Sequence, residues 1–182
     1  MGFLKWLRGG DPKGYKKLTV TFTAEESEAM EQNLAMHAKA AKDIAVSESG
    51  DDADLLVPPK VIETIKAQGL SYYAERLMDR IVLNEQLTEE QIQEIGDKAA
   101  KAQLKAYGLH NLPTYMFEAA QIFDLLGRTE DALTWFRLFL KEQERFAPDK
   151  IDEVFLNNLG KSDATEEISI ARRRLAQEGC QS

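Results

Sequence analysis

The sequence predicts an all-α protein built from antiparallel helical hairpins. Apolar residues recur at helical spacing along most of the 182 residues, and residues that begin or end helices separate these stretches. Hydrophobic residues make up 43% of the chain and charged residues 30%, a balance typical of a folded globular protein. The predicted connections are short, so we expect consecutive helices to pack side by side.

The first part of the chain differs from the rest. Residues 1–17 hold five Lys or Arg against one Asp, a net charge of +4, whereas the whole chain carries −8. Glycine and proline between positions 9 and 14 disfavour a continuing helix. Residues 18–23 then alternate apolar side chains with threonine, which predicts a single short strand. No second strand is predicted, so its open edge favours a homodimer.

The first helix is predicted from Thr23 to about Val46. Thr23 and Glu26 have the spacing of a capping box, in which each residue bonds the other's backbone amide. An acidic loop over 47–54 follows. Proline at 58 and 59 suits the first turn of a new helix.

Glycine is expected to interrupt the middle of the chain twice. Gly69 is predicted to end the helix that starts at the two prolines, and a second helix then runs to about Val82. Thr88 and Gln91 form another capping-box pattern, and Gly108 is predicted to follow the end of that helix. The remaining helices are predicted over 112–126, 129–146, 148–159 and 164–177, the third with Pro148 at its start.

Residues 113–146 carry the most specific pattern in the chain. Small residues, aromatic residues and a turn glycine recur at fixed offsets: Ala120, Phe123, Gly127, Ala132 and Phe136. The small residues let two antiparallel helices approach closely, the aromatic residues fill the seam, and Gly127 takes the left-handed conformation that ends a helix. The segment resembles one tetratricopeptide (TPR) repeat, about a fifth of the chain. It departs from that repeat at Phe139, where alanine is usual and where looser packing of the next helix is therefore expected.

This resemblance implies a TPR-like right-handed array of hairpins. The expected organisation is a basic segment over 1–17 and a helical domain over 18–182, itself divided into a first helix and acidic loop (18–57), TPR-like hairpins (58–147) and C-terminal capping helices (148–182). The resemblance also implies a non-catalytic scaffold that holds a protein or peptide partner in a groove. The groove residues that it indicates are Tyr115, Glu118, Gln121 and Ile122.

Two other functions fit the residues. In the first, the basic segment contacts an anionic membrane surface and the protein is a peripheral adaptor. Its contact residues are then Phe3, Leu4, Lys5, Trp6, Leu7 and Arg8. In the second, an irregular helical bundle forms an enzyme or small-ligand site. The residues for that pocket are Tyr72, Tyr73, His110 and Tyr115.

The sequence offers little other chemistry. With two histidines, no His-Glu-x-x-His motif and one cysteine, Cys180, it predicts no metal site, no cofactor and no enzyme. Glycine-rich phosphate-binding motifs are missing. The acidic balance disfavours nucleic acid as a partner. Without a secretion signal or paired cysteines, we expect the cytoplasm, with contact at the inner membrane surface if the basic segment binds lipid.

Overall fold

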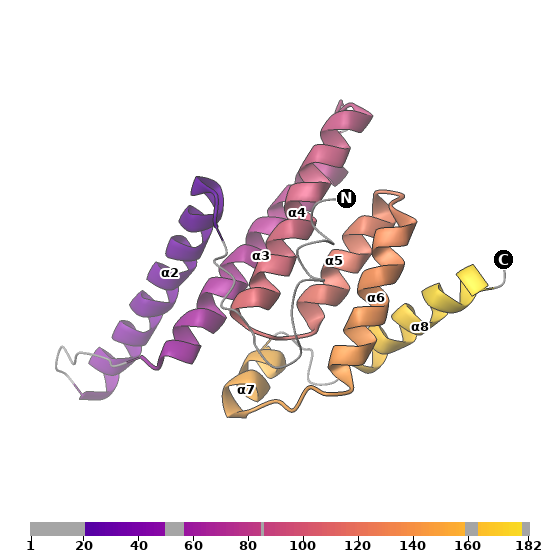
Figure 1. The fold of residues 1–182 in the computed structure, drawn as a ribbon. Coiled ribbons are helices and arrows are strands. Elements are labelled where there is room, and N and C mark those ends of the chain that lie inside the picture. The colour runs from indigo at the N-terminus through magenta and orange to yellow at the C-terminus, as the bar shows by residue number, and fades with distance from the viewer. Residues whose placement is uncertain (1–20, 50–56, 85, 159–163, 180–182) are drawn as a thin grey trace.

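A computed structural model describes residues 21–49, 57–84, 86–158 and 164–179. All regular secondary structure in these residues is helical, which confirms the predicted all-α class (Figure 1). The seven helices of the described residues are α2 (Ala24–Ser49), α3 (Pro59–Leu83), α4 (Glu89–Leu109), α5 (Thr114–Leu125), α6 (Thr129–Gln143), α7 (Lys150–Asn158) and α8 (Thr165–Gly179).

The helices form a row in chain order. Figure 1 shows α2, α3, α4, α5 and α6 side by side, each running opposite to its predecessor, with α8 beyond α6 and α7 apart from the row at its lower end. Short connections favour this antiparallel packing of neighbours. The row is therefore a chain of helical hairpins, as predicted. The TPR resemblance and the right-handed twist stay predictions.

Both predicted capping boxes are confirmed. At the start of α2, the Thr23 amide donates to Glu26 Oε2 at 2.8 Å, and the Glu26 amide donates to Thr23 Oγ1 at 3.2 Å. At the start of α4, Thr88 and Gln91 make the same reciprocal pair, at 2.9 and 3.3 Å. These bonds satisfy amides that a helix start otherwise leaves unpaired.

Two glycine predictions are wrong. Gly69 does not end a helix, because α3 runs unbroken from Pro59 to Leu83. A Cβ at Gly69 would lie 2.8 Å from the Ala29 carbonyl oxygen, so this glycine marks the close approach of α2 and α3. Gly108 lies inside α4, and the helix ends one residue later, with His110 as its C-cap.

Of two other predicted helix boundaries, the one at Gly127 is confirmed and the one at Pro148 is wrong. Gly127 ends the α5–α6 turn with φ +71°, the left-handed conformation that was predicted. Pro148 does not begin α7. The side chain of Asp149 instead accepts hydrogen bonds from the amides of Ile151 and Asp152, at 2.9 and 3.0 Å, and so caps the first turn.

The predicted strand is not seen in the part of it that the structure describes. Residues 21–23 are neither strand nor helix, while residues 18–20 and the basic segment 1–17 lie outside the described residues. Phe22 packs at the edge of a buried cluster formed by α2, α3, α4, α5, α7 and the α4–α5 loop. Residues 21–23 thus lead into α2 with Phe22 packed against the cluster, and a homodimer through 18–23 stays a prediction.

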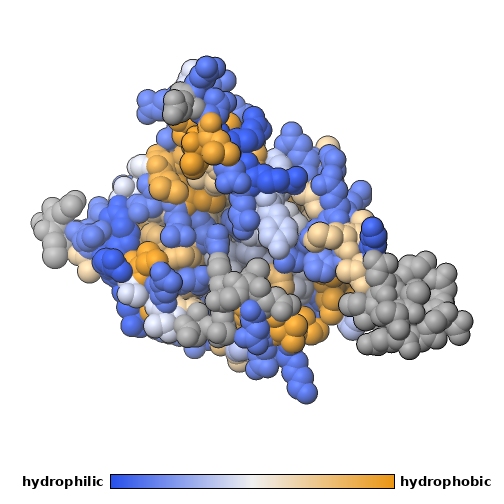
Figure 2. Space-filling model, turned by 180° about the vertical axis from the view of Figure 1, so that it is seen from behind, coloured by the Kyte–Doolittle hydropathy of each residue, from blue (hydrophilic) through white to orange (hydrophobic). Residues whose placement is uncertain are grey.

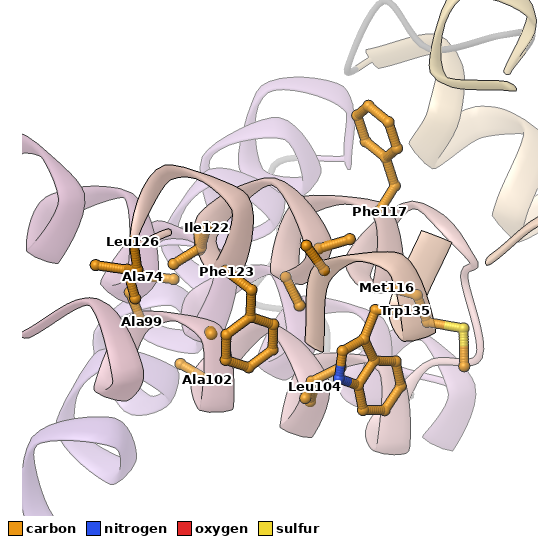
Figure 3. Close-up of a cluster of buried hydrophobic side chains, with 14 of the residues drawn as sticks. Ala74, Ala99, Ala102, Leu104, Met116, Phe117, Ile122, Phe123, Leu126 and Trp135 are labelled. Carbon is orange, nitrogen blue, oxygen red and sulfur yellow. The ribbon is translucent and has the colours of Figure 1, made fainter. Parts of the chain in front are cut away.

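The core runs through the hairpins of α3 to α6. Small residues line the seams, and Figure 3 shows Phe123 of α5 beside Ala99 and Ala102 of α4. The predicted seam residues Ala120, Phe123, Ala132 and Phe136 are all buried. Alanine at the crossings brings the helix backbones close together, and the aromatic rings fill the remaining space.

Phe139 is accommodated inside this core. It is fully buried, and its ring centroid lies 5.3 Å from that of Phe117 at an interplanar angle of 52°. Phe136 contacts the same Phe117 ring, and the centroids of these two rings are 5.8 Å apart. Phe117 belongs to the preceding helix α5, so this contact does not test the looser packing expected of the next helix at Phe139, which stays a prediction.

Arg128 ties three helices together at the α5–α6 turn. Its guanidinium donates to Asp97 of α4 at 2.6 Å and to Asp131 of α6 at 2.7 Å, and it lies 4.5 Å from the ring centre of Phe123. We expect Arg128→Ala to lower the free energy of unfolding by about 1 kcal/mol, since the ion pairs are partly solvated. Urea unfolding measures this. Arg137→Ala, at an exposed position on α6, is the matched control and should change little; equal losses would contradict the assigned role.

Candidate functional site

The four predicted groove residues do not share one exposed surface. Tyr115 and Ile122 of α5 are buried, with 2% and 6% exposure, whereas Glu118 and Gln121 are half-buried. Tyr115 belongs to the cluster that also contains Phe22 and Phe155 of α7. Ile122 lies in the main core of α3 to α6, so the two buried residues belong to different clusters. The role of the four residues in binding a partner stays a prediction.

The residues of the alternative enzyme pocket differ in burial and in their contacts. Tyr72 accepts a hydrogen bond from Gln68 at the surface, and His110 pairs with Asp152 under α7. Tyr115 is buried, which raises the pKa of its phenol, and its hydroxyl has no hydrogen-bond partner among the described residues. Tyr73 alone of the four lines the cleft described next.

An open cleft of about 290 Å³ separates the upper halves of α2 and α3. Its lining residues are Glu25, Glu28, Ala29, Gln32, Tyr73, Arg76, Leu77 and Arg80. The carboxylates come from α2 and the arginines from α3, with Ala29 and Leu77 buried at the base. The cleft therefore offers an apolar floor between walls of opposite charge, which suits a short polypeptide segment better than a single charged ligand.

Tyr73 is fixed in this cleft by a hydrogen bond. Its hydroxyl donates to Glu25 Oε2 at 2.6 Å. Partial burial, this hydrogen bond and the nearby carboxylates raise the pKa of Tyr73, so the phenol keeps its proton at neutral pH. The sequence indicated Tyr73 and Leu77 as one face of a helix, but the register that sets α2 against them depends on Gly69.

A second polar cluster, the His110 cluster, comprises Lys60, His110, Asp149 and Asp152. His110 Nε2 lies 2.7 Å from Asp152 Oδ1, and Lys60 Nζ lies 3.0 Å from Asp152 Oδ2. Lys60 also pairs with Asp149. His110 and Asp152 are both buried. These contacts attach α7 to the start of α3 and to the C-terminal end of α4.

Burial sets the protonation of His110. Burial lowers its pKa below the usual value, against the opposing effect of the Asp152 carboxylate. Because Asp152 accepts the hydrogen bond, Nε2 carries the proton, and Nδ1 has no partner among the described residues. Burial alone would raise the pKa of Asp152, but hydrogen bonds from the Asp149 amide, His110 and Lys60 hold it below the usual value. The cluster therefore holds an ionised Asp152 beside a neutral His110.

Acid is expected to loosen α7. A second proton on His110 would place an unpartnered donor at Nδ1, so this group stabilises the folded state fully above its unfolded pKa of about 6.5 and less as pH falls through its lower folded pKa. Asp149, with a pKa of about 2, and Asp152 stay ionised over that range, and Lys60 stays protonated. Hydrogen exchange of residues 150–158, corrected for intrinsic rates, should be faster at pH 5 than at pH 7.5. His110→Gln removes the titrating group, and its exchange should depend less on pH; an equal dependence would contradict this origin.

Neither a metal-binding group nor a membrane-spanning helix is found among the described residues. No group of three or more acidic, histidine or cysteine side chains is placed to hold a metal ion in the described residues, and His37 Nε2 lies 3.2 Å from Gln68 Oε1. None of the described helices is both long enough and apolar enough to cross a bilayer. The predicted membrane-contact residues 3–8 and Cys180 lie outside the described residues.

Comparisons with protein-family models, with curated proteins and with solved structures found no match.

Proposed function

We propose that this protein is a non-catalytic scaffold that holds a segment of a protein partner in the cleft between α2 and α3. The observation that carries the proposal is the cleft itself, open to solvent and walled by charges of both signs. A row of hairpins presents such surfaces on rigid elements, where side chains keep fixed positions without a mobile loop.

The chemistry of the cleft indicates what the segment carries. Leu77 and Ala29 at the base favour an apolar side chain. Glu28 on one wall and Arg76 on the other favour a basic and an acidic side chain on either side of it. The fitting segment is therefore short and amphipathic, with flanking charges of both signs.

Capture from native lysate tests this proposal. The bait is the purified chain, and the cleft variant reverses both wall cations, Arg76→Glu with Arg80→Glu. The control, Arg172→Glu with Arg173→Glu, makes the same charge change at exposed positions of α8. A stoichiometric partner retained by the wild type and the control, and lost by the cleft variant, is expected. Capture that is equal in all three would contradict the proposal, as would no partner with any of them.

The basic segment favours a second function, contact with an anionic membrane surface. Its charge of +4 against the acidic remainder supports this proposal, since each Lys or Arg near such a surface contributes about 1 kcal/mol. Vesicles containing phosphatidylserine should sediment the full chain but not a chain lacking residues 1–17. Binding should weaken as salt rises. Sedimentation that is unchanged by the deletion would contradict the proposal.

The surface also presents isolated apolar side chains. Figure 2 shows a largely hydrophilic face with an apolar patch near the protruding tip of the α3–α4 hairpin. Val82 and Leu83 at the end of α3 are 74% and 82% exposed. Two exposed residues at one helix end are too small a patch to define a function.

A further inference from the structure

α7 is the least integrated helix of the described residues. It is nine residues long, shorter than the roughly 12–15 residues at which an isolated helix becomes even marginally stable. Figure 1 shows it apart from the row of the other helices. Its stability therefore depends on the surface against which it docks. We call that surface the α7 seat.

The apolar half of the α7 seat holds one aromatic anchor. Phe155 is buried in a cluster with Leu70 of α3, Ala106 of α4 and Leu112 of the following loop. Its ring also meets the His110 ring edge to face, with centroids 5.7 Å apart. The cluster also includes Met30 of α2 and Tyr115 of α5, so the seat is built by the other helices and not by α7.

The polar half of the α7 seat holds one carboxylate. Lys60 and His110 both contact Asp152, one on each carboxylate oxygen. Asp152 and Phe155 are three residues apart and so share one face of the helix. On the other side of α7, Glu153 and Val154 are exposed. The seat thus binds one short pattern, an aspartate at position i and a phenylalanine at position i+3.

We propose that the α7 seat is a docking site for an acidic amphipathic helix of a partner protein, with aspartate three residues before phenylalanine, which binds by displacing α7. The proposal commits to this occupant because α7 itself occupies the site and because Lys60 complements an acidic helix. The seat lies at the lower ends of α3 and α4, away from the α2–α3 cleft, so the proposal does not rest on a partner bound in that cleft.

Displacement is a competition between a tethered helix and a free one. The tether gives α7 an effective concentration in the millimolar range, so a free helix with the same contacts binds the intact chain weakly. Loss of the two anchors of α7 removes the competitor and leaves Lys60, His110 and the apolar residues of the seat in place. The affinity of the seat for a free helix should then rise.

The test is binding of a labelled peptide with the sequence of residues 146–158. The open-seat protein is the full chain with Asp152→Ala and Phe155→Ala, and the matched control is the full chain with Glu153→Ala and Val154→Ala, which keeps both anchors. We expect the open-seat protein to bind the peptide at least about tenfold more tightly than the wild type or the control. A peptide with alanine at both anchor positions should not bind. Equal affinity of all three proteins, with helical content retained, would overturn the proposal.

A measurement on the unmodified chain tests the proposal even if the open-seat protein fails to fold. Hydrogen exchange by mass spectrometry is followed with and without excess peptide, made with heavy isotopes so that its fragments are distinct. Amides of 150–158 should exchange faster than those of α4, and faster again with the peptide present. Protection of α7 equal to that of α4, or no response to peptide, would overturn the proposal. Neither result bears on capture by the α2–α3 cleft.

Discussion

Replacement of Phe139 by alanine is expected to lower the free energy of unfolding by about 3–5 kcal/mol. The side chain is fully buried, and its ring packs against Phe117 across the α5–α6 seam. The change removes the transfer free energy of the ring and leaves a cavity between helices whose alanine-rich seams have little freedom to collapse. Alanine is usual at this position of a TPR repeat. The substitution therefore tests whether this chain needs its own phenylalanine here or tolerates the residue that the resemblance implies.

Urea unfolding followed by far-UV circular dichroism measures this loss. Leu125→Ala is the control, since Leu125 is 76% exposed and its truncation should change the free energy of unfolding by less than about 0.5 kcal/mol. A Phe139→Ala protein as stable as the control would show that the seam closes around the smaller side chain. Such a result would contradict the assignment of Phe139 to a packed core.

Gly69→Ala is expected to destabilise the fold by about 1–3 kcal/mol, although alanine is the better helix former by about 1 kcal/mol. The added methyl would lie 2.8 Å from the Ala29 carbonyl oxygen and 3.0 Å from the Met30 Cα. Both are backbone atoms of α2, so relief requires α2 to move away from α3. The shift would also disturb the cleft between the upper halves of these helices.

Gly108→Ala is the matched control, because Gly108 is exposed and lies in the last turn of α4. Thermal unfolding should show a lower midpoint for Gly69→Ala and an unchanged or slightly higher one for Gly108→Ala. Equal shifts of the two variants would mean that helix propensity decides, and that the close approach at Gly69 is not a constraint.

Local signals predicted much of the fold. Thr23 with Glu26, and Thr88 with Gln91, bond only to neighbours a turn away, so their spacing alone identifies two helix starts. Gly127 needs only its own backbone conformation to end a helix. The all-α class and the α5–α6 hairpin follow from such short-range rules and from the helical spacing of apolar residues.

The candidate sites could not be predicted from such short-range rules, because they depend on contacts between residues far apart in the sequence. Gly69 has the same sequence character as a helix end, and only the arrival of α2 against it shows that it is a contact point. His110 is the α4 C-cap, and its partner Asp152 lies 42 residues away in the sequence, beyond the reach of any local pattern. Tyr115 was predicted at a partner surface because nothing local shows that Phe155 and Phe22 share its cluster.

The sequence by itself determined the helical class, the capped helix starts, the turn at Gly127 and the alanine and aromatic seam of α5 and α6. Tertiary structure alone decided the register of α2 on α3, the cleft between them, and the placement of α7 against the start of α3 and the end of α4. The physical reason is one of range. Caps, turns and helical periodicity are set within one or two turns of the chain, whereas a cleft or a covered surface depends on which distant side chains exclude one another when the helices pack.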